Sequence, residues 1–371
     1  MKSLTQIEKE NINHSEVLFY QGCSVTECAV ILAGSSFNFA LHLGILAALH
    51  ESGLHPDVII ASCGGALAEA IINKFPDCED QKKYIQSLEF YNLLHKAKLQ
   101  NDFIPYLLFR LTKMKLQHSL SKFFSYTPDF LDRNIFHISK TLDLPLFDRF
   151  FSPTTPRFIM TAGRLIQDHS KFLQEVFFTD VETAKLLKDF PSPIATQFPH
   201  SFLKTETATL TDWKFSEAAR AAIADPFLLN PFEKEGVLYF SGSIDLYPLE
   251  LAAKLSQRII MLYSPLFRSI DQIVLRHFYG YDNIQRYQFI TSQTAVERWI
   301  DISDYQEFMK NNGFDPQSHY IKGKVVNGTP VDKKEFFRKA SAQWDYGWQR
   351  AQEALSHPAY SKKHIRKPYN F

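Results

Sequence analysis

The sequence has little cysteine and almost no net charge. Its 371 residues include four cysteines (Cys23, Cys28, Cys63 and Cys78), and they follow no metal-ligand spacing. We therefore expect no metal site and no disulfide framework, which favours a reducing compartment. The formal net charge of +1 gives no overall signal for a nucleic-acid partner.

Long hydrophobic runs are also missing. The stretch 1–16 lacks the apolar segment of a secretory signal peptide. No window reaches the roughly 18 consecutive apolar residues that a membrane-spanning helix needs. We therefore expect a protein that is cytoplasmic or peripheral to a membrane.

What the chain does have is apolar and aromatic side chains. Hydrophobic residues make up 45% of it, enough for one large α/β domain with additions or for two domains. Aromatic residues make up 14%, including 33 Phe. This abundance indicates either bulky core packing or apolar surface that binds apolar ligands.

The first hundred residues alternate between two periodicities. Short apolar runs at 27–34 and 56–61 predict buried strands, and helical spacing follows each run, at 37–53 and 65–75. Strands that alternate with helices in this order predict a mostly parallel sheet with helices on both faces.

Residues 80–150 read differently and predict a helical insertion. The part 81–124 is helical, aromatic and basic. It is a candidate for the acyl-chain pocket or for peripheral membrane contact, because basic and aromatic residues suit an anionic interface. The alternative is a set of solvated helices packed on the main sheet.

The strand and helix signals then resume towards the C-terminus, where a helix precedes a basic tail. The expected strands are 157–163, 175–179, 236–243, 258–264 and, more weakly, 283–291, and the expected helices are 211–229, 248–255 and 332–355.

Three strand–turn segments carry the candidate chemistry. In 32–46 a Gly and Ser turn opens a helix, where backbone N–H groups can hold an oxyanion. In 59–67 the sequence IIASCGGAL forms a tight turn that presents Cys63 at its apex. In 239–252 a strand leads into a Gly-containing turn, Asp245 and a Pro. Open α/β sheets place their sites at such strand ends.

The order, spacing and flanks of these segments resemble the patatin-like phospholipase family. That family has a G-G-G-x-R-G oxyanion turn, a G-x-S-x-G nucleophile elbow and a D-G-G or D-G-A motif that supplies the base. The flanks LGILAAL, PDVIIASCGGAL and SEAARAAIADPFLLNPF resemble those of the family. The resemblance implies a patatin-like α/β fold, a lipid acyl ester or thioester as substrate, and no cofactor.

The resemblance also implies a division of the chain. We expect an N-terminal extension over 1–24 and a patatin-like domain over 25–265 that contains the insertion 80–150. A C-terminal extension with strand, helix and basic tail would then occupy 266–371.

Every chemical motif of the family is altered here. Gly34 is followed by Ser35 and Ser36 instead of two glycines, and Asn38 stands at the position of the family's Arg. Cys63 replaces the nucleophilic Ser, and Ser241 replaces the Asp.

One interpretation is a thiol-dependent acyl hydrolase or acyltransferase with Cys63 as the nucleophile. A helix N-terminus can lower a thiol pKa, so the loss of the Asp is more tolerable once Ser is Cys. Backbone groups at Gly34, Ser35, Ser36 and Gly64 would stabilise the oxyanion.

The sequence leaves the base of this enzyme open. Asp245 is a weak alternative to the lost Asp and is better read as part of a structural turn. His42, on the helix after the first turn, is a second alternative and is more typical of a structural histidine.

The other interpretation is an inactive patatin-like protein that binds lipid or a protein partner. Scattered losses across all three motifs are typical of a scaffold retained without its activity. A free Cys at a tight turn can also be a small buried hydrophobe.

Overall fold

The structure is a computed structural model that describes residues 26–99, 103–120, 126–131, 134–138, 147–166, 171–264, 269–293, 295–319 and 322–357. The expected N-terminal extension 1–24, Cys23 and the basic tail 361–371 lie outside these residues.

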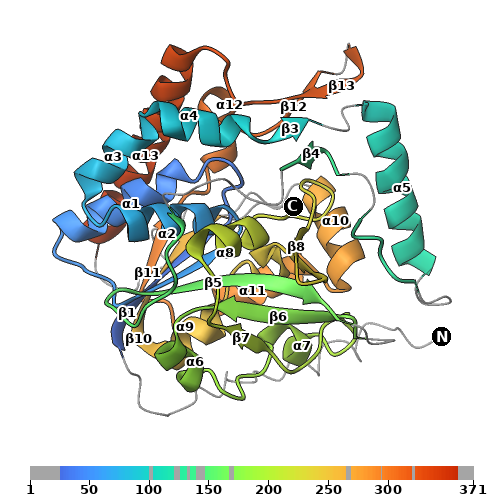
Figure 1. Cartoon of the computed structure of the whole chain (residues 1–371), viewed down its shortest axis with the longest axis horizontal. Coiled ribbons are helices and arrows are strands. Elements are labelled where there is room, and N and C mark those ends of the chain that lie inside the picture. The colour runs from blue at the N-terminus through green and yellow to red at the C-terminus, as the bar shows by residue number, and fades with distance from the viewer. Residues whose placement is uncertain are drawn as a thin grey trace, which may run out of the picture.

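The centre of the structure is a mixed, mostly parallel sheet that has nine strands among the described residues (Figure 1). Its main path is β11-β10-β1-β2-β5-β6-β7. Neighbours from β11 to β5 run parallel, whereas β6 and β9 are antiparallel to β5. The strands are β1 (Thr26–Ala33), β2 (Val58–Ser62), β5 (Arg157–Leu165), β6 (Leu173–Phe178), β7 (Ala208–Leu210), β8 (Phe232–Lys234), β9 (Val237–Phe240), β10 (Ser256–Tyr263) and β11 (Arg298–Asp301).

Helices cover the sheet and extend beyond it. They are α1 (Ala40–Glu51), α2 (Gly64–Lys74), α3 (Cys78–Ile85), α4 (Leu88–His95), α5 (Ile104–Leu120), α6 (Val181–Leu186), α7 (Pro193–Gln197), α8 (Phe215–Ala222), the 3₁₀ helix η2 (Gly242–Asp245), α9 (Leu249–Leu255), α10 (Ser269–Tyr279), α11 (Asn283–Ser292), α12 (Tyr305–Asn312) and α13 (Lys333–Ser356). Two small antiparallel pairs join β3 (Lys98–Leu99) with β4 (Phe136–His137) and β12 (Gln317–His319) with β13 (Lys324–Val326).

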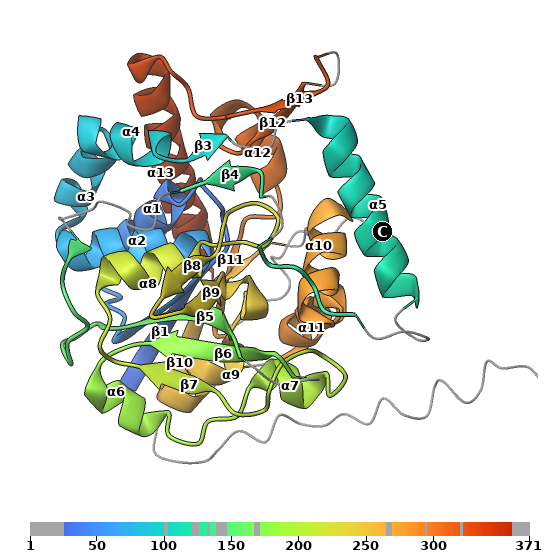
Figure 2. The same cartoon turned by 45° about the vertical axis from the view of Figure 1, so that its right-hand side comes forward.

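The apolar runs of the central strands supply two cores, one on each face of the sheet. In β1, Val30 and Leu32 join one core while Ala29 and Ile31 join the other, as the two-residue period of a strand requires. The first core lies under α1, α2 and α8, and the second lies against α9 and α11 (Figure 2). A strand that is buried on both faces needs an unbroken apolar run, and the apolar run within 27–34 meets this need.

The helix α13 packs closely across α1. A Cβ placed on Gly44 would lie 2.0 Å from the carbonyl oxygen of Trp344, and one on Gly347 would lie 1.9 Å from that of Leu41. Only glycine allows backbones to approach this closely. The close contact attaches the C-terminal segment to the helix that follows the first candidate turn.

Most of the expected elements are confirmed. The α/β fold class with a mostly parallel sheet flanked by helices is confirmed, and the helical part 81–124 contains α4, α5 and most of α3. One element is wrong: 283–291 forms the helix α11, not a strand. The Asp282 side chain accepts hydrogen bonds from the N–H groups of Ile284 and Gln285 and so begins a helix there. The domain limits stay a prediction, although β11 pairs with β10 across the expected boundary at 265.

Candidate active site

The sharp turn after β2 has the geometry of a nucleophile elbow. Cys63 joins β2 directly to α2 and has φ 51° and ψ −126°. A non-glycine residue at such a φ is strained by about 1–3 kcal/mol, and such strain is concentrated at functional sites. The side chain of Cys63 is 5% exposed.

Two glycines allow the elbow to form. A Cβ on Gly65 would lie 2.0 Å from the carbonyl oxygen of Leu32 in β1. A Cβ on Gly64 would lie 2.3 Å from the carbonyl oxygen of Ser36. The small residues that the sequence places around Cys63 are therefore required by the closeness of the first turn and β1.

The third segment presses against the same elbow. A Cβ on Gly242 would lie 2.6 Å from the carbonyl oxygen of Thr161 and 2.9 Å from the Cα of Ser62. The Ser62 hydroxyl donates to the carbonyl of Leu246 at 2.8 Å. The fold thus brings all three candidate segments together.

The nearest acid to Cys63 is Asp225, which lies just after α8. The Cys63 Sγ donates a hydrogen bond to Asp225 Oδ2 at 3.0 Å. The backbone N–H of Ser241 donates to the carbonyl of Ala224 at 3.1 Å, so the turn where the family has its Asp lies beside Asp225. A carboxylate from a neighbouring segment therefore reaches the thiol.

Both groups of this pair have raised pKa values. Burial is the main cause for Cys63, and the charge of Asp225 raises the pKa of the thiol further, well above its usual value. The Gly64 amide and the Ser241 hydroxyl oppose this rise only in part. The helix N-terminus therefore does not give the low thiol pKa that the sequence suggested, because burial and a carboxylate outweigh it.

The pKa of Asp225 is raised because its carboxyl is removed from water. The hydrogen bond from Cys63 to Oδ2 and the nearby hydroxyls of Ser241 and Ser243 act in the opposite direction and favour the carboxylate, whereas Oδ1 is buried with no hydrogen-bond partner among the described residues. Ser243 also shares a hydrogen bond of 2.8 Å with the Tyr279 hydroxyl. Two hydroxyl groups thus influence the acid, and one of them belongs to Ser241, at the position of the family's Asp.

The first turn has a positive φ at three successive residues, two of which are not glycine. Gly34, Ser35 and Ser36 have φ values of 69°, 75° and 50°. For the two serines this left-handed backbone costs on the order of 1 kcal/mol each. The Gly34 N–H donates to the carbonyl of Ser62 at 3.3 Å, which ties the turn to the elbow. The oxyanion role of these residues and Gly64 stays a prediction.

Asn38 joins this turn to the C-terminal segment. Its side-chain amide donates to the Tyr305 hydroxyl at 2.8 Å and to Asp315 at 2.7 Å, and it accepts from the N–H of Phe314 and from Gln343. Tyr305 also donates to the Ser35 carbonyl at 3.2 Å. The residue that stands where the family has Arg is therefore a fully buried connector.

The two alternative bases make other contacts. His42 is fully buried in α1 near the Gly34 carbonyl, and burial lowers its pKa to about 4, so the ring is neutral. Asp245 pairs with Arg286 at 2.9 Å and accepts from the N–H of Tyr247. These contacts fit the structural turn that the sequence favoured for Asp245.

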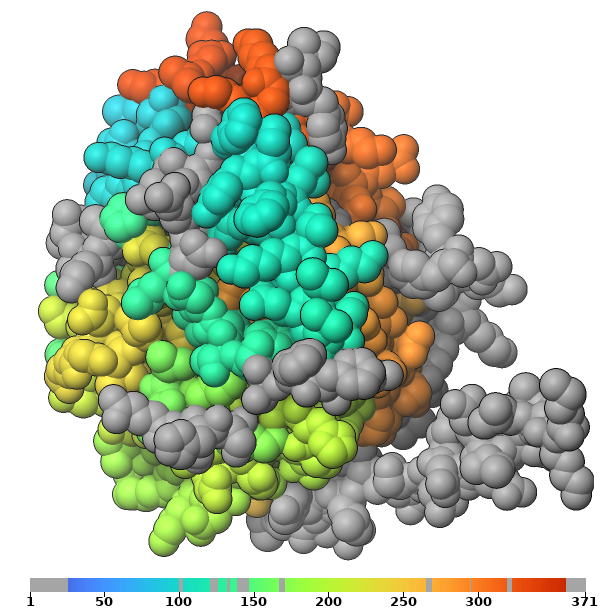
Figure 3. All heavy atoms as spheres, turned by 90° about the vertical axis from the view of Figure 1, so that its right-hand side faces the viewer, coloured from blue at the N-terminus to red at the C-terminus, as the bar shows by residue number. Residues whose placement is uncertain are grey.

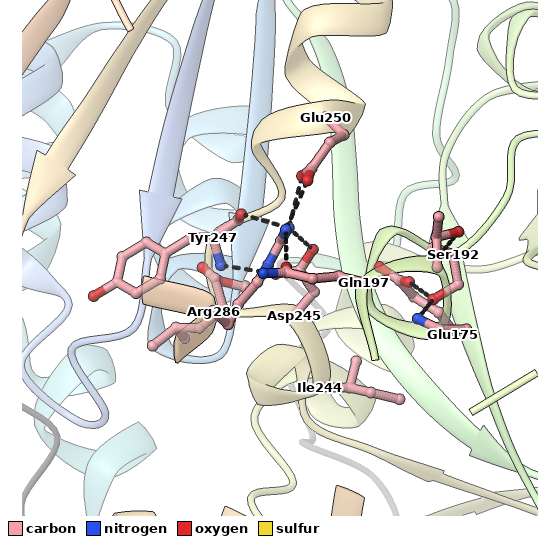
Figure 4. Close-up of polar contacts among 12 residues, drawn as sticks. Glu175, Ser192, Gln197, Ile244, Asp245, Tyr247, Glu250 and Arg286 are labelled. Atoms are coloured by element: carbon pink, nitrogen blue, oxygen red, sulfur yellow. Dashed lines mark hydrogen bonds and ion pairs between the residues drawn. The ribbon is translucent and has the colours of Figure 1, made fainter. Parts of the chain in front are cut away.

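Asp245 belongs to a buried charged cluster on η2, α9 and α11 (Figure 4). Arg286 pairs with both Asp245 and Glu250, the latter at 2.6 Å. Glu175 accepts from the Ser192 hydroxyl at 2.9 Å. Burial, together with the charge of Asp245, raises the pKa of Glu175 to about 8. The cluster fixes the end of η2, whose beginning lies beside Asp225.

Sequence reasoning missed Asp225. The signal was present, because Asp225 directly follows the apolar residues 221–224 and precedes Pro226 and the apolar residues 227–229. Asp225 lies in the family-like flank 216–232 that precedes the third segment, whereas the two bases that the sequence analysis considers, Asp245 and His42, lie outside this flank.

A family model described as patatin-like phospholipase matches residues 30–253. The structure of VipD from Legionella pneumophila is 10% identical, with a TM-score of 0.33, and the match covers 90% of this chain and 67% of that one. Human GIVD cytosolic phospholipase A2 is 10% identical, with a TM-score of 0.35 over 90% of this chain and 62% of that one. No curated protein matches the chain. In the part of the chain that the structure describes, no helix is both long and apolar enough to cross a membrane.

Proposed function

The chain belongs to the patatin-like phospholipase family, and from this premise we propose that it is a lipid acyl hydrolase or acyltransferase with Cys63 as nucleophile and Asp225 as base. The observation that carries the proposal is the 3.0 Å hydrogen bond from Cys63 Sγ to Asp225 Oδ2 at a strained elbow. Backbone strain at the apex is expected where a side chain must be presented to a substrate. The substrate class, an acyl ester or thioester of a lipid, follows from the family.

The reaction begins with a neutral thiol. Sulfur attacks the acyl carbonyl carbon while its proton passes to the Asp225 carboxylate. The tetrahedral oxyanion is held by the backbone N–H groups of Ser35, Ser36 and Gly64, because the Gly34 N–H already donates to the Ser62 carbonyl. When it collapses, the bond to the leaving oxygen or sulfur breaks, and Asp225 returns the proton to that atom. An acyl thioester remains on Cys63.

Water or another acceptor then releases the acyl group. Asp225 takes a proton from the acceptor as its oxygen attacks the thioester, and the departing sulfur recovers that proton. The result is a carboxylic acid with water, or a new ester with an alcohol. One carboxyl therefore acts as base and acid in both halves of the reaction.

The raised pKa values support Asp225 in this role. A thiol that is neutral at physiological pH needs a base, in contrast to a preformed thiolate. A carboxylate whose pKa is raised by burial is also a stronger base than an exposed one. The nearby hydroxyls of Ser241 and Ser243 favour its charged form. The lost Asp is thus replaced by an acid 16 positions earlier in the chain, at 225 instead of 241.

A second function, lipid or partner binding without turnover, is favoured by a specific observation. Cys63 is 5% exposed, and the carbonyl oxygens of Gly34 and Ser36 lie close to the α-carbon of Gly64. Acceptors beside the elbow do not stabilise an oxyanion. In this case the segment 81–124 would contact lipid at a membrane surface while the elbow serves only the fold.

The experiment that separates the two functions follows the acyl group. The full chain is incubated with phospholipid, acyl-coenzyme A and short-chain ester substrates, and intact mass and product release are measured. We expect an acyl adduct on Cys63 that hydroxylamine removes, no adduct in Cys63→Ala, and wild-type behaviour in the control Cys78→Ala. Product release by Cys63→Ala at the wild-type rate would exclude Cys63 as nucleophile, and lipid binding without any adduct or release would support the second function.

A further inference from the structure

The helix α5 has two apolar faces, and only one of them is packed. Leu107, Leu111 and Met114 are buried against the body of the protein. On the other side lies an outer stripe, which we define as Leu108, Phe109, Leu116 and Leu120. Their exposed fractions are 55%, 65%, 58% and 41%. Large apolar side chains that are exposed together mark an interaction surface.

The outer stripe has two small exposed polar residues, Thr112 and Ser119, among its apolar side chains and is bordered by cations. Leu108, Leu116 and Leu120 recur at multiples of four residues, which keeps them on one side of a helix. At about 100° per residue, Lys113 and Lys115 fall at the two opposite edges of this stripe. Both lysines are exposed. Lysines in such positions can place their ammonium groups beside the apolar layer that the stripe enters.

The charge of α5 has one sign. The helix sequence IPYLLFRLTKMKLQHSL contains one arginine and two lysines and no Asp or Glu. A helix with an apolar stripe, basic edges and no acid is typical of segments that lie in the interface of an anionic lipid surface. An acidic protein partner would explain the lysines but not the width of the exposed apolar stripe.

The helix is also placed next to the candidate active site. It lies outermost on the molecule, against α10 (Figures 1 and 2), and its outer side is open to view in Figure 3. Beneath it, the guanidinium of Arg110 stacks on the ring of Phe227 at 4.8 Å, two residues after Asp225. A surface bound to the outer stripe would therefore lie on the side of the molecule from which α5 covers the Asp225 segment.

We propose that the outer stripe of α5 docks the protein on an anionic lipid surface. The four apolar side chains enter the boundary between headgroups and acyl chains, and Lys113 and Lys115 contact anionic headgroups. Docking itself needs no catalysis. Its use in delivering a lipid to Cys63 rests on the proposed function.

The test is flotation of the full chain with vesicles of phosphatidylcholine, with and without phosphatidylserine. The Cys63→Ala chain is used throughout, so that turnover does not change the vesicles. Phe109→Ser with Leu116→Ser tests the stripe, and Lys113→Gln with Lys115→Gln tests its edges. Matched controls are Val181→Ser and Lys188→Gln, which change exposed residues of and after α6 on another part of the molecule. Thermal unfolding checks that each variant is folded.

We expect binding that depends on phosphatidylserine. The stripe variant should bind at least ten-fold more weakly, because two large apolar side chains are lost from the interface. The edge variant should lose about five-fold for each lysine. Both controls should bind like the parent chain.

Equal binding of the stripe variant and the parent chain would overturn the proposal, as would a dimer in solution that the stripe variant dissociates, since a second copy would then be the occupant. Docking of the Cys63→Ala chain, combined with no acyl adduct on the unmodified wild-type chain in the separate adduct assay, would refute only the enzymatic function.

Discussion

Cys63 and Asp225 are 162 positions apart in the chain, and their side chains are joined by a hydrogen bond of 3.0 Å. Each group affects the ionisation of the other. The charge of Asp225 disfavours a Cys63 thiolate, and the hydrogen bond from the Cys63 thiol favours the Asp225 carboxylate. A pair of this kind suits proton transfer during attack and does not suit a permanently ionised sulfur. This gives a test in which two readouts of one variant move in opposite directions.

Asp225→Asn should abolish most catalysis and yet make the thiol more reactive. Loss of the base should lower kcat/KM by roughly 10²–10⁴-fold. Loss of the negative charge should lower the pKa of Cys63, because the charge of Asp225 is, after burial, the largest cause of the raised thiol pKa. We therefore expect faster alkylation of Cys63 by iodoacetamide near neutral pH, measured by peptide mass spectrometry.

Asp189→Asn is the matched control for this prediction, because Asp189 is an exposed residue at a loop position with positive φ. It should leave both readouts unchanged. If alkylation of Cys63 slowed in Asp225→Asn along with catalysis, the carboxylate would be helping to form a thiolate, and the neutral-thiol mechanism would be wrong.

Ser241→Asp returns an acid to the position at which the family has one. Ser241 is fully buried, and its hydroxyl favours the charged forms of both Cys63 and Asp225. A second buried carboxyl there would oppose the first, so we expect a loss of stability of about 3 kcal/mol or more and a loss of activity. Urea unfolding and ester turnover measure the two effects.

The double variant Ser241→Asp with Asp225→Asn gives the sharper result. The double variant has a carboxyl at position 241 and an amide at position 225, whereas the wild type has a hydroxyl at 241 and a carboxyl at 225. Both therefore hold one carboxyl beside Cys63. We expect it to be more stable than Ser241→Asp alone and more active than Asp225→Asn alone. Failure to recover either property would mean that residue 225 does not substitute for residue 241.

The elbow should tolerate no side chain at Gly65. A Cβ there would lie 2.0 Å from the Leu32 carbonyl, near the carboxyl end of β1, which pairs on both sides within the sheet. We expect Gly65→Ala to lower the free energy of unfolding by about 1–3 kcal/mol, as overpacking does, and to displace Cys63. Gly53→Ala is the control, because a Cβ at Gly53 meets nothing within 4 Å and the change adds only the strain of a φ of 74°. Equal losses for the two variants would show that the β1 contact costs no more at Gly65 than backbone strain does at Gly53, and would contradict this prediction.

The fold could be predicted because its signals are local. The runs 27–34 and 56–61 each lie within one strand that is buried on both faces, and such strands can be recognised from a few successive residues. The short, mixed composition of the segment 283–291 suggests a strand, and that prediction is wrong. Tyr287 and Ile290 are apolar at a spacing that fits the helix found there. The Asp282 cap was the signal that should have decided it.

The site was less predictable because its contacts are distant in sequence. In the sequence, Asn38 is only a residue that stands where the family has Arg. The fold shows its hydrogen-bond partners, of which Gln343 is 305 positions away. The thiol pKa depends on burial and on Asp225, neither of which is visible around position 63. The motifs located the elbow, whereas its electrostatics came from segments that no motif covers.

The buried cluster beside η2 should make stability depend on pH. Glu175 has a pKa of about 8 in the fold, against 4.5 when it is exposed in the unfolded chain, because burial and Asp245 disfavour its charge. Between these values the folded chain holds a proton that the unfolded chain has lost. Its contribution is therefore complete below about pH 4.5 and is lost as pH rises through about 8, on the order of a few kcal/mol.

Glu175→Gln isolates this effect from other titrating groups. The amide oxygen can still accept the hydrogen bond from Ser192, which is 2.9 Å long in the wild type, but the side chain cannot ionise. We expect the variant and the wild type to be similar in stability near pH 4.5, and the variant to be the more stable above pH 8, in urea unfolding at a series of pH values. The exposed Glu206→Gln should show no such divergence. A constant difference between Glu175→Gln and wild type at all pH values would mean that Glu175 is already ionised in the fold, and that Arg286 then balances three carboxylates instead of two.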